Sequence, residues 1–309
     1  MIRMNTMTEQ DRAEVARVNS LLKEKILQWL PGPGKLQTAI PGLVLAHRTE
    51  ANQSEHIFGN PCVGVIVQGN KCSVMGSREY RYGAGQYCVS GVDMPSAFYV
   101  INPSTEVPFL SMGLDLDRYL ITRLTAELAP STATGHGPCQ GVAVSAADPD
   151  LLGAFLRLLH LLDKPEQIPF LAPMVIQEIH YILLMGPMGE NLRKLNTLGS
   201  QSNQIAQAIF WLRNNYRKPF QVDSLARQVN MATSTFHRHF KEVTGLSPLQ
   251  FHKRLRLYEA QRLMLVENEA ASSAGFAVGY ESITQFNREY KRLFGEPPHR
   301  DLNRRKGNM

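Results

Sequence analysis

The apolar, basic and turn-forming positions in the last third of the chain repeat once, about 50 residues apart. Six positions recur at an offset of 50: Phe236, Arg238, Phe240, Lys241, Gly245 and Pro248 return as Phe286, Arg288, Tyr290, Lys291, Gly295 and Pro298. In each copy the two aromatic residues stand at i, i+4 on one helix face, after a short helix that carries Ala226 or Gly275. Asn230 and Gly279 suit a turn with positive φ. The pattern predicts two helix-turn-helix units, and the 49-residue offset of these turn residues makes the second turn one residue longer.

A long helical pattern from 247 to 265 joins the two copies. Ser247 caps it, Pro248 takes the first turn, and an apolar stripe follows, made of Phe251, Leu255, Tyr258 and Leu263. About 18 residues at about 1.5 Å each span roughly 27 Å, close to the roughly 34 Å pitch of B-DNA. We therefore expect the second helix of each unit to enter successive major grooves, so that one chain reads two half-sites without dimerising. A helical protein-interaction module is the alternative, but it needs no Arg and Lys on each repeated exposed face.

In the first 115 residues the apolar pattern changes to short runs of β type. Seven runs rich in Val, Ile, Tyr and Cys are separated by Gly, Pro, Asn and Ser, at 43–48, 62–69, 71–75, 78–82, 86–90, 96–101 and 109–115. Seven such strands with even spacing indicate a barrel or a sandwich. A helix is expected ahead of them at about 6–29. The predicted fold class is α+β, with an N-terminal β-barrel, flanking helices and an all-α C-terminal domain.

Residues 116–200 carry helical patterns at 117–128, 151–162 and 169–185. The second of these is apolar around most of its circumference, so it must be covered by the barrel or by another subunit. Gly, Pro and Ser after Met185 indicate an interdomain linker. The predicted boundaries are 1–190 for the N-terminal domain (barrel about 36–116, helices about 117–186), 187–202 for the linker and 203–309 for the DNA-binding domain.

Charge divides the chain in the same way. Residues 201–309 hold 17 Lys and Arg against 9 Asp and Glu, a net of +8, whereas the preceding residues hold 16 and 18, a net of −2. A basic domain attracts DNA phosphates without reading sequence. The predicted phosphate contacts are Lys241, Lys253, Arg254, Arg256, Lys291 and Arg292, and Arg304, Arg305 and Lys306 of the tail are further candidates.

The base contacts are expected on the exposed faces of the two reading helices. They are Ser234, His237 and Arg238 in the first and Thr284, Asn287 and Arg288 in the second. Arg grips guanine and Asn prefers adenine, so these residue types suit base reading in the major groove. Arg238 and Arg288 occupy the same repeated position, so a shared structural role for this pair is the alternative.

Residues 205–300 resemble the DNA-binding domain of the AraC/XylS family of transcriptional regulators. The resemblance is carried by Val278-Gly279-Tyr280-Glu281-Ser282, Phe286, Arg288, Tyr290-Lys291-Arg292, Phe294-Gly295 and Pro297-Pro298. It implies seven helices: one at about 203–216, the two helix-turn-helix units, the helix between them and a short final helix. Ala274 and Gly275 stand where many members have Ile and Ala. Because a helical Gly costs about 1 kcal/mol relative to Ala, the second unit is expected to be the looser one.

A less specific resemblance covers roughly residues 30–190. Val65-Ile66-Val67-Gln68-Gly69, Lys71 and Tyr82-Gly83-Ala84-Gly85-Gln86-Tyr87 resemble the cupin-like N-terminal regulatory domain of one AraC subgroup. Metal cupins need a His-x-His pair, a carboxylate and a later His, whereas His47, His56 and His136 are scattered singly. The sequence contains no P-loop, no Gly-x-Gly-x-x-Gly and no nucleophile elbow. We therefore predict no metal, no cofactor and no enzyme, and a pocket at the barrel mouth for an unidentified small molecule.

Four cysteines are the remaining unusual chemistry of this half: Cys62, Cys72, Cys88 and Cys139. None forms a Cys-x-x-Cys pair, which argues against zinc and against a thioredoxin-like site. One interpretation is that all four are small buried apolar residues in a reducing compartment. The other is that Cys62 or Cys88 senses oxidants or electrophiles such as aldehydes through thiolate chemistry.

The two resemblances imply a sequence-specific DNA-binding transcriptional regulator, more often an activator, controlled by a small-molecule or redox signal in its N-terminal domain. They also imply contact with RNA polymerase and a homodimer formed by the helices after the barrel. The sequence shows no membrane-spanning run and no signal-peptide pattern, so a cytoplasmic, nucleoid-associated protein is expected.

Two alternatives remain open. One is a cysteine-dependent enzyme targeted to DNA, although Pro61-Cys62-Val63 lacks the His and Arg that follow the nucleophile in repair proteins of that kind. The other is an architectural DNA-binding protein that needs no ligand and tolerates many sequences.

Overall fold

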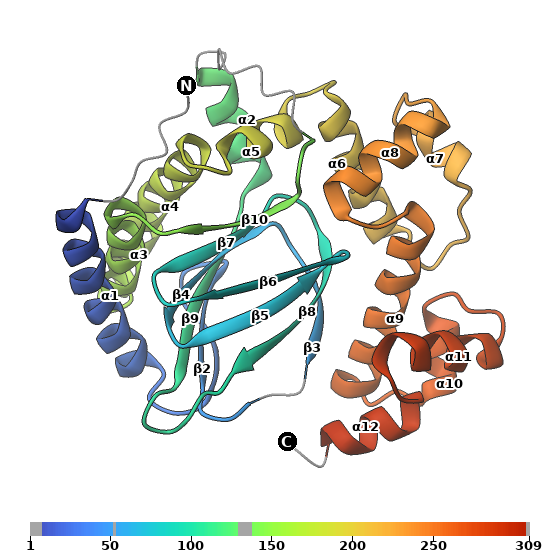
Figure 1. The fold of residues 1–309 in the computed structure, drawn as a ribbon, viewed down its shortest axis with the longest axis horizontal. Coiled ribbons are helices and arrows are strands. Elements are labelled where there is room, and N and C mark those ends of the chain that lie inside the picture. Colours follow the sequence, from blue (N-terminus) through green and yellow to red (C-terminus); the bar gives the residue numbers. More distant parts are fainter. Residues whose placement is uncertain (1–7, 52–53, 129–137, 307–309) are drawn as a thin grey trace.

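The computed structural model describes residues 8–51, 54–128 and 138–306, and it has the α+β architecture expected from the sequence (Figure 1). Two antiparallel sheets face each other in the N-terminal half, helices cover the outer side of one sheet, and the C-terminal third is all helical. His136, one of the three single histidines considered for metal binding, lies outside the described residues.

The larger sheet has six strands in the order β1 (Gly34–Gln37), β2 (Leu43–Arg48), β9 (Phe109–Asp115), β4 (Cys62–Gln68), β7 (Gln86–Ser90) and β10 (Val142–Ala146). The smaller sheet has the order β3 (Glu55–Gly59), β8 (Met94–Ile101), β5 (Asn70–Met75) and β6 (Arg78–Gly83). Each of the seven predicted strands is present. The structure adds β1, β3 and β10. Because β10 follows the helix Arg118–Glu127 and pairs with β7, the expected change from strands to helices near residue 115 is not complete.

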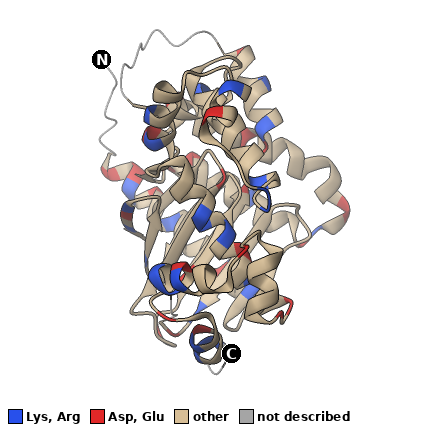
Figure 2. Cartoon of the chain, turned by 90° about the vertical axis from the view of Figure 1, so that its right-hand side faces the viewer, with Lys and Arg blue, Asp and Glu red and all other residues tan. Residues whose placement is uncertain are grey.

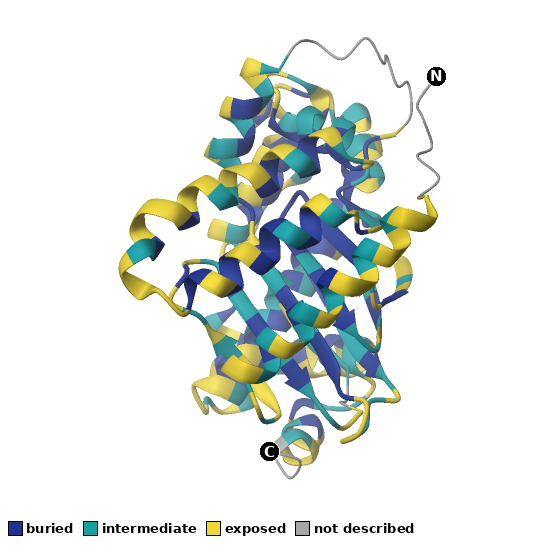
Figure 3. Ribbon diagram, turned by 90° about the vertical axis from the view of Figure 1, so that its left-hand side faces the viewer, coloured by how far each residue is buried: buried dark blue, intermediate teal, exposed yellow. Residues whose placement is uncertain are grey.

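Four helices cover or flank the six-stranded sheet: α1 (Glu9–Trp29), α2 (Arg118–Glu127), α3 (Pro149–Leu161) and α4 (Ile168–Met185), with a 3-10 turn at Pro165–Gln167. The strongly apolar α3 is covered within the chain, since Leu152, Phe155 and Leu159 are fully buried with residues of α1, α4 and the sheet. Figure 3 shows these helices with buried inner sides and exposed outer sides. The second subunit considered for covering α3 is therefore not needed there.

The segment Pro165–Met185 is long and apolar enough, by length and composition alone, to cross a membrane. In this respect the expectation that the sequence holds no such run was wrong. The helix nevertheless packs into the protein core, where Ile179, Leu183 and Leu184 are buried with α3. Five other apolar side chains of this helix are exposed on the molecular surface: Phe170, Leu171, Met174, Tyr181 and Met185.

The predicted linker 187–202 is not an extended tether. It contains α5 (Gly189–Asn196), whose Leu192 and Leu195 are buried against the N-terminal half and α6. Asn203 Nδ2 donates to Leu195 O at 3.0 Å, which ties α6 to α5. Only residues 197–200 separate the two helices, so the C-terminal domain follows the N-terminal one without a flexible spacer.

The C-terminal domain has the seven helices that the resemblance implied: α6 (Gln201–Asn214), α7 (Val222–Gln228), α8 (Thr233–Thr244), α9 (Pro248–Val266), α10 (Ala271–Ala277), α11 (Ile283–Phe294) and α12 (Pro298–Lys306). The turn between α7 and α8 spans residues 229–232 and the turn between α10 and α11 spans 278–282, so the second is one residue longer, as predicted. Asn230 (φ 56°) and Gly279 (φ 92°) occupy the left-handed turn positions.

The two domains share one apolar core. Ile66, Met94 and Val100 of the sheets are buried in the same cluster as Phe240 of α8 and Phe251 of α9. The first helix-turn-helix is therefore packed on the sheets, whereas α10 and α11 form a separate small core with α9. This unequal attachment was not visible in the sequence.

Candidate nucleic-acid interface

The first helix-turn-helix presents a polar face to solvent because its apolar side chains are buried in the core. Phe236 and Phe240 are fully buried and their rings contact each other at 5.5 Å between centroids. Thr233 Oγ1 donates to Asp223 Oδ1 at 2.8 Å, which fixes the start of α8 against α7. Gly245, at φ 71°, ends the helix in the left-handed conformation. The residues predicted to contact DNA here are all exposed: Ser234, His237, Arg238 and Lys241.

The second helix-turn-helix repeats this construction with a closer helix crossing. Ser282 caps α11 by accepting from the backbone N–H of Gln285 at 3.3 Å. A Cβ at Gly275 would lie 3.1 Å from the ring of Phe286, so the glycine that departs from the family pattern lets this aromatic ring approach α10. The residues predicted to contact DNA in this copy are exposed as well: Thr284, Asn287, Arg288, Lys291 and Arg292.

Three basic residues of α9 that were predicted to contact phosphate have intramolecular partners. Lys253 Nζ pairs with Glu289 Oε1 of α11 at 2.8 Å, and Arg254 Nη1 donates to Gly76 O of the β5–β6 turn at 2.7 Å. Arg256 donates to the carbonyls of Tyr216 (2.6 Å), Gly279 (3.0 Å), Arg217 (3.2 Å) and Lys218 (3.1 Å). Arg256 thus holds the turn of the second unit against the segment after α6. The structure favours a positioning role for Arg256 over the predicted phosphate contact.

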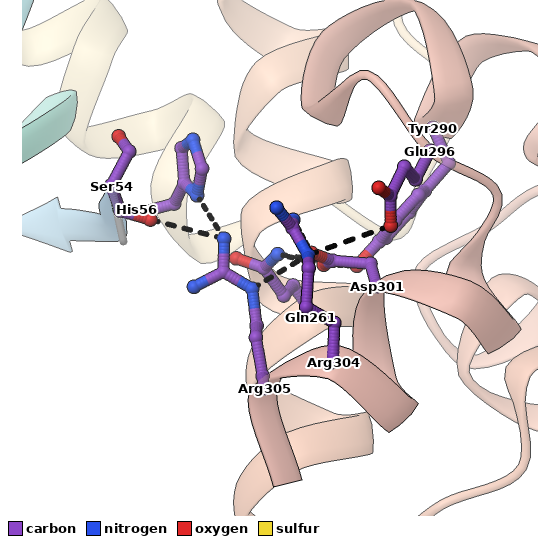
Figure 4. A network of polar contacts seen from close by, with 8 residues as sticks. All are labelled: Ser54, His56, Gln261, Tyr290, Glu296, Asp301, Arg304 and Arg305. Carbon is purple, nitrogen blue, oxygen red and sulfur yellow. Dashed lines mark hydrogen bonds and ion pairs between the residues drawn. The ribbon is translucent and has the colours of Figure 1, made fainter. Parts of the chain in front are cut away.

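A second network holds α12 in place, centred on the fully buried Asp301 (Figure 4). Its carboxylate accepts from Gln261 Nε2 of α9 at 2.6 Å and from Tyr290 Oη of α11 at 2.8 Å. Arg304 Nη2 and Arg305 Nε donate to the other oxygen at 2.9 Å each. Burial alone would raise the pKa of Asp301, but the Tyr290 hydrogen bond and the Arg305 charge keep it below its usual value. The charged carboxylate therefore joins three helices of the domain.

Arg305 also extends this network to the N-terminal sheets. Its Nη2 donates to Ser54 O at 3.0 Å and contacts His56 Nδ1 at 3.3 Å (Figure 4). His56 lies between the rings of Tyr258 and Phe294, with centroids at 5.3 and 4.7 Å. Burial, and next the Arg305 charge, lower the pKa of His56 to about 4. His56 is therefore a neutral packing residue at the domain contact, in line with its sequence spacing, which does not suit a metal site.

The basic side chains of the C-terminal domain are spread over several helices. Figure 2, which views the molecule from the side of these helices, shows Lys and Arg on more than one of them with Asp and Glu between. α9 directs its cations to carbonyls and to Glu289, and the tail arginines Arg304 and Arg305 pair with Asp301. The exposed Lys and Arg side chains of the two reading helices are Arg238, Lys241, Arg288, Lys291 and Arg292, of which Arg238 also contacts His239 of its own helix at 3.3 Å. Phosphate binding by Lys241, Lys291 and Arg292 stays a prediction.

Cys62 and Cys88, the candidate sensors, lie on neighbouring strands of the larger sheet. Gly64 pairs with Cys88, so Cys62 and Cys88 share the face that looks toward the smaller sheet. Burial raises the pKa of Cys62 to about 11 and that of Cys88 to about 12. Both are therefore protonated thiols near neutral pH, which removes the thiolate on which the sensor hypothesis depends. The same argument opposes a cysteine-dependent enzyme.

Among the described residues, no group of three or more His, Cys, Asp and Glu side chains is arranged to hold a metal ion. His47, the third histidine considered, has its Nδ1 3.0 Å from Leu30 O and is almost fully buried. It thus has a structural contact at the end of α1.

The structure also reveals contacts that sequence reasoning missed. Asp93, 1% exposed in the turn before β8, forms ion pairs with Arg118 of α2 and Arg213 of α6. The β5–β6 turn contacts the end of α8, since a Cβ at Gly76 would collide with Thr244 O. Gly141 N donates to Val243 O at 3.0 Å beside this contact. The partners are 25 to 168 positions apart in sequence, so no local sequence pattern predicts these contacts.

Profiles of two known families match the chain. The profile described as AraC-type transcriptional regulator N-terminus matches residues 39–191, and the profile described as helix-turn-helix domain matches residues 225–304. Together they account for most of the chain, on both sides of the segment 192–224.

Two curated relatives resemble the chain in part. RhaS, a transcriptional activator from Pectobacterium carotovorum, is 25% identical over 44% of this chain and 47% of its own length. ExsA, a transcriptional regulator from Pseudomonas aeruginosa, is 27% identical over 53% of this chain and 58% of its own length. The chain thus spans about half the length of these relatives.

A solved structure shares the fold over nearly the whole length. ToxT from Vibrio cholerae aligns with 86% of this chain and 98% of its own, with a TM-score of 0.56 and 9% sequence identity. This likeness concerns the arrangement of the two domains' elements. With the two profile matches and the curated relatives, it leads to one assignment: the chain belongs to the AraC/XylS family of transcriptional regulators.

Proposed function

We propose that the protein binds double-stranded DNA in a sequence-specific way and regulates transcription from that site. The observation that supports this most strongly is the pair of capped reading helices, α8 and α11, each with a polar and basic exposed face and joined by the rigid α9. The predicted base contacts are Ser234, His237, Arg238, Thr284, Asn287 and Arg288. At about 1.5 Å per residue, the 19 residues of α9 span roughly 28 Å, which suits successive turns of B-DNA.

Arg288 offers the sharpest test of base reading. Within the described part of the chain it is exposed and makes no ion pair, so nothing in the fold depends on its guanidinium. We expect Arg288→Ala to weaken binding to the cognate site by about 1–3 kcal/mol and to flatten discrimination at one base pair. The cognate site comes from selection of bound genomic fragments, and binding is measured by fluorescence anisotropy at fixed salt.

The matched control is Arg300→Ala, an exposed arginine at the start of α12 outside both reading helices. Its loss should be small and equal for cognate and random DNA. If Arg288→Ala weakens both DNAs equally, the residue contacts phosphate; if wild-type protein shows no preferred sequence at all, the regulator proposal fails and the architectural alternative takes its place.

We further propose that a small molecule in the N-terminal domain controls DNA occupancy, with activation through RNA polymerase as the output. Direct contacts between the domains support this coupling, because the β5–β6 turn touches both the end of α8 and Arg254 of α9. A ligand that shifts this hairpin changes the position of the first reading helix, which is a population shift between two arrangements. The protein is then expected to act in the cytoplasm, on the nucleoid.

A homodimer is proposed through the outer face of α4. Phe170, Met174, Tyr181 and Met185 are 75%, 68%, 47% and 59% exposed and recur at helical spacing. An apolar stripe of this kind on a helix otherwise packed into the core is typical of a subunit interface. A second copy of the same stripe is a partner of matching chemistry.

We expect Met174→Lys to convert a dimer into a monomer at micromolar concentration, measured by sedimentation velocity. Val107→Lys is the control, because Val107 is a similarly exposed apolar residue (57%) in the β8–β9 loop, away from α4. A wild-type protein that sediments as a monomer at that concentration contradicts the proposal.

A further inference from the structure

The face of the six-stranded sheet that looks toward the smaller sheet is closed by side chains only in part. Along β2, β4 and β9 the residues that face the helices are fully buried, such as Leu45, Val63 and Met112. The alternate residues face the smaller sheet. Ile66 and Phe109 among them are buried, but the others are only half-buried: Val44, Ala46, Cys62, Gly64, Ser111 and Gly113. This alternation indicates space between the sheets along these three strands.

Two paired glycines mark the most open point of this face. Gly64 of β4 pairs directly with Gly113 of β9 on one side and with Cys88 of β7 on the other. A Cβ at Gly64 would meet no atom within 4 Å, and a Cβ at Gly113 only the Val63 carbonyl of its own sheet, at 3.8 Å. Since neither backbone conformation nor a close neighbour requires glycine here, the missing side chains leave room for another molecule.

Lys71 brings a positive charge to this space from the facing sheet. It lies on β5, paired with Val100 and Tyr82, and its Nζ is 3.9 Å from the centroid of the Phe98 ring. Cys88 and Cys62 of the larger sheet are close enough to interact electrostatically with the Lys71 amino group, so the Lys71 side chain lies between the two sheets. Burial lowers the pKa of Lys71.

No carboxylate in the described part of the chain pairs directly with this ammonium. Among the described residues none lies within ion-pair distance of Lys71 Nζ, and the nearby Glu55 pairs with Arg48 at 2.5 Å. A ring face offsets only part of the cost of removing a cation from water. Hydroxyl groups stand next to it on the same sheet face, with Ser73 Oγ 3.1 Å from Tyr82 Oη. A cation and hydroxyl donors beside open space form a site for an anion.

We propose that the space between the sheets binds a small organic carboxylate, with its charged group on Lys71 and its apolar part along Gly64, Gly113 and Phe98. This inference rests on the proposed function, because it names the chemical class of the effector that controls the regulator. It also supplies a path to DNA. Lys71 and Gly76 belong to the same hairpin. The Gly76 carbonyl accepts a hydrogen bond from Arg254 of α9, and Gly76 contacts the end of α8.

The test uses the full chain and a series of three carboxylates, acetate, hexanoate and benzoate, each with its neutral amide. Binding is measured by isothermal titration calorimetry and by the shift in melting temperature. We expect at least one carboxylate to bind, and its amide to bind at least tenfold more weakly. Lys71→Met should weaken the carboxylate at least tenfold, whereas Lys35→Met, at an exposed lysine of β1, should leave it unchanged.

The melting temperature without ligand separates a binding role from a structural one. Because Lys71→Met removes an uncompensated charge and keeps a chain of similar length, the variant should melt at the same or a higher temperature. A clear fall in melting temperature, no binding by any of the three carboxylates, or unchanged binding in Lys71→Met each overturns the proposal. These readouts need no DNA, so their failure leaves the DNA-binding assays, and the proposed function, unaffected.

Discussion

Replacing Gly279 by alanine is expected to abolish sequence-specific DNA binding and to lower the free energy of unfolding of the C-terminal domain by at least about 3 kcal/mol. Two effects add at this position. Gly279 has φ 92°, where any other residue is strained by about 1–3 kcal/mol. A Cβ there would also collide with Arg217 O and lie 2.9 Å from Arg256 Nη2. The methyl group would therefore push apart the turn and the arginine that holds it.

Gly295 provides a matched control within the same domain. It has φ 84°, close to that of Gly279, but a Cβ at Gly295 would meet nothing within 4 Å. Gly295→Ala should show the conformational strain alone, about 1 kcal/mol, with DNA binding largely retained. Urea unfolding of both variants, with anisotropy on the cognate DNA, measures the difference. Equal losses in the two variants would show that the contact with Arg217 has no energetic weight.

The contrast between these glycines illustrates what the sequence could predict. The repeat offset located both turns and the extra residue in the second one, because a left-handed turn leaves a local signature in Asn or Gly. The role of Arg256 did not follow from the pattern, since a basic residue on a helix looks the same whether it faces phosphate or four backbone carbonyls. Only the fold brings Tyr216, Arg217 and Gly279 around that one guanidinium.

The N-terminal half shows the same difference between features with a local sequence signal and features that depend on tertiary contacts. Strands β2, β7 and β9 were predicted at their observed bounds because apolar runs between turn residues are a local signal. By contrast, β1 is a four-residue, mostly exposed edge strand, and β10 follows a helical segment, so neither offers a clear apolar run. The helix α5 stands where Gly and Ser indicated a linker, and it is stabilised by burial of Leu192 and Leu195, which is a tertiary effect.

The site residues could be predicted where a local sequence pattern determines their position on a helix. The repeated positions correctly placed the predicted base-contacting residues on exposed faces of α8 and α11, although their contacts with DNA remain predictions. Lys71 was visible within the family-like stretch after Gly69, but its role depends on strands that are far apart in sequence, β4, β7 and β9. The same holds for the ion pairs that Asp93 forms between the domains, since its partners Arg118 and Arg213 are 25 and 120 positions away in sequence.

Replacing Asp93 by alanine is expected to weaken the junction of the two domains by about 3 kcal/mol or more. Asp93 is buried and pairs with Arg118 of α2 and Arg213 of α6, so it joins the sheets and α2 of the N-terminal domain to the first helix of the C-terminal one. Removing one partner of a buried ion pair costs about 3–5 kcal/mol because the remaining charges lose their compensation. Both arginine side chains are 34% exposed, so solvent recovers part of this and the lower end of the range applies.

The measurement is urea unfolding of the full chain followed by tryptophan fluorescence, which reports on Trp211 in α6 and on Trp29 in α1. Asp163→Ala is the control, since Asp163 pairs with Lys25 at 2.5 Å on the surface and should contribute no more than about 1 kcal/mol. A double-mutant cycle of Asp93 with Arg213 should give a coupling of about 1–3 kcal/mol.

Loss of this junction should also change regulation. If Asp93 holds α6 at a fixed angle to the sheets, Asp93→Ala should keep its affinity for cognate DNA within a fewfold range and lose the response of that affinity to ligand. The reason is that the ion-pair partners of Asp93 among the described residues lie on α2 and α6, outside the reading helices, whereas α6 packs on α8 and connects it to the half of the chain proposed to bind the ligand. A variant that unfolds like Asp163→Ala and responds to ligand like wild type would show that the two domains communicate through the β5–β6 hairpin alone.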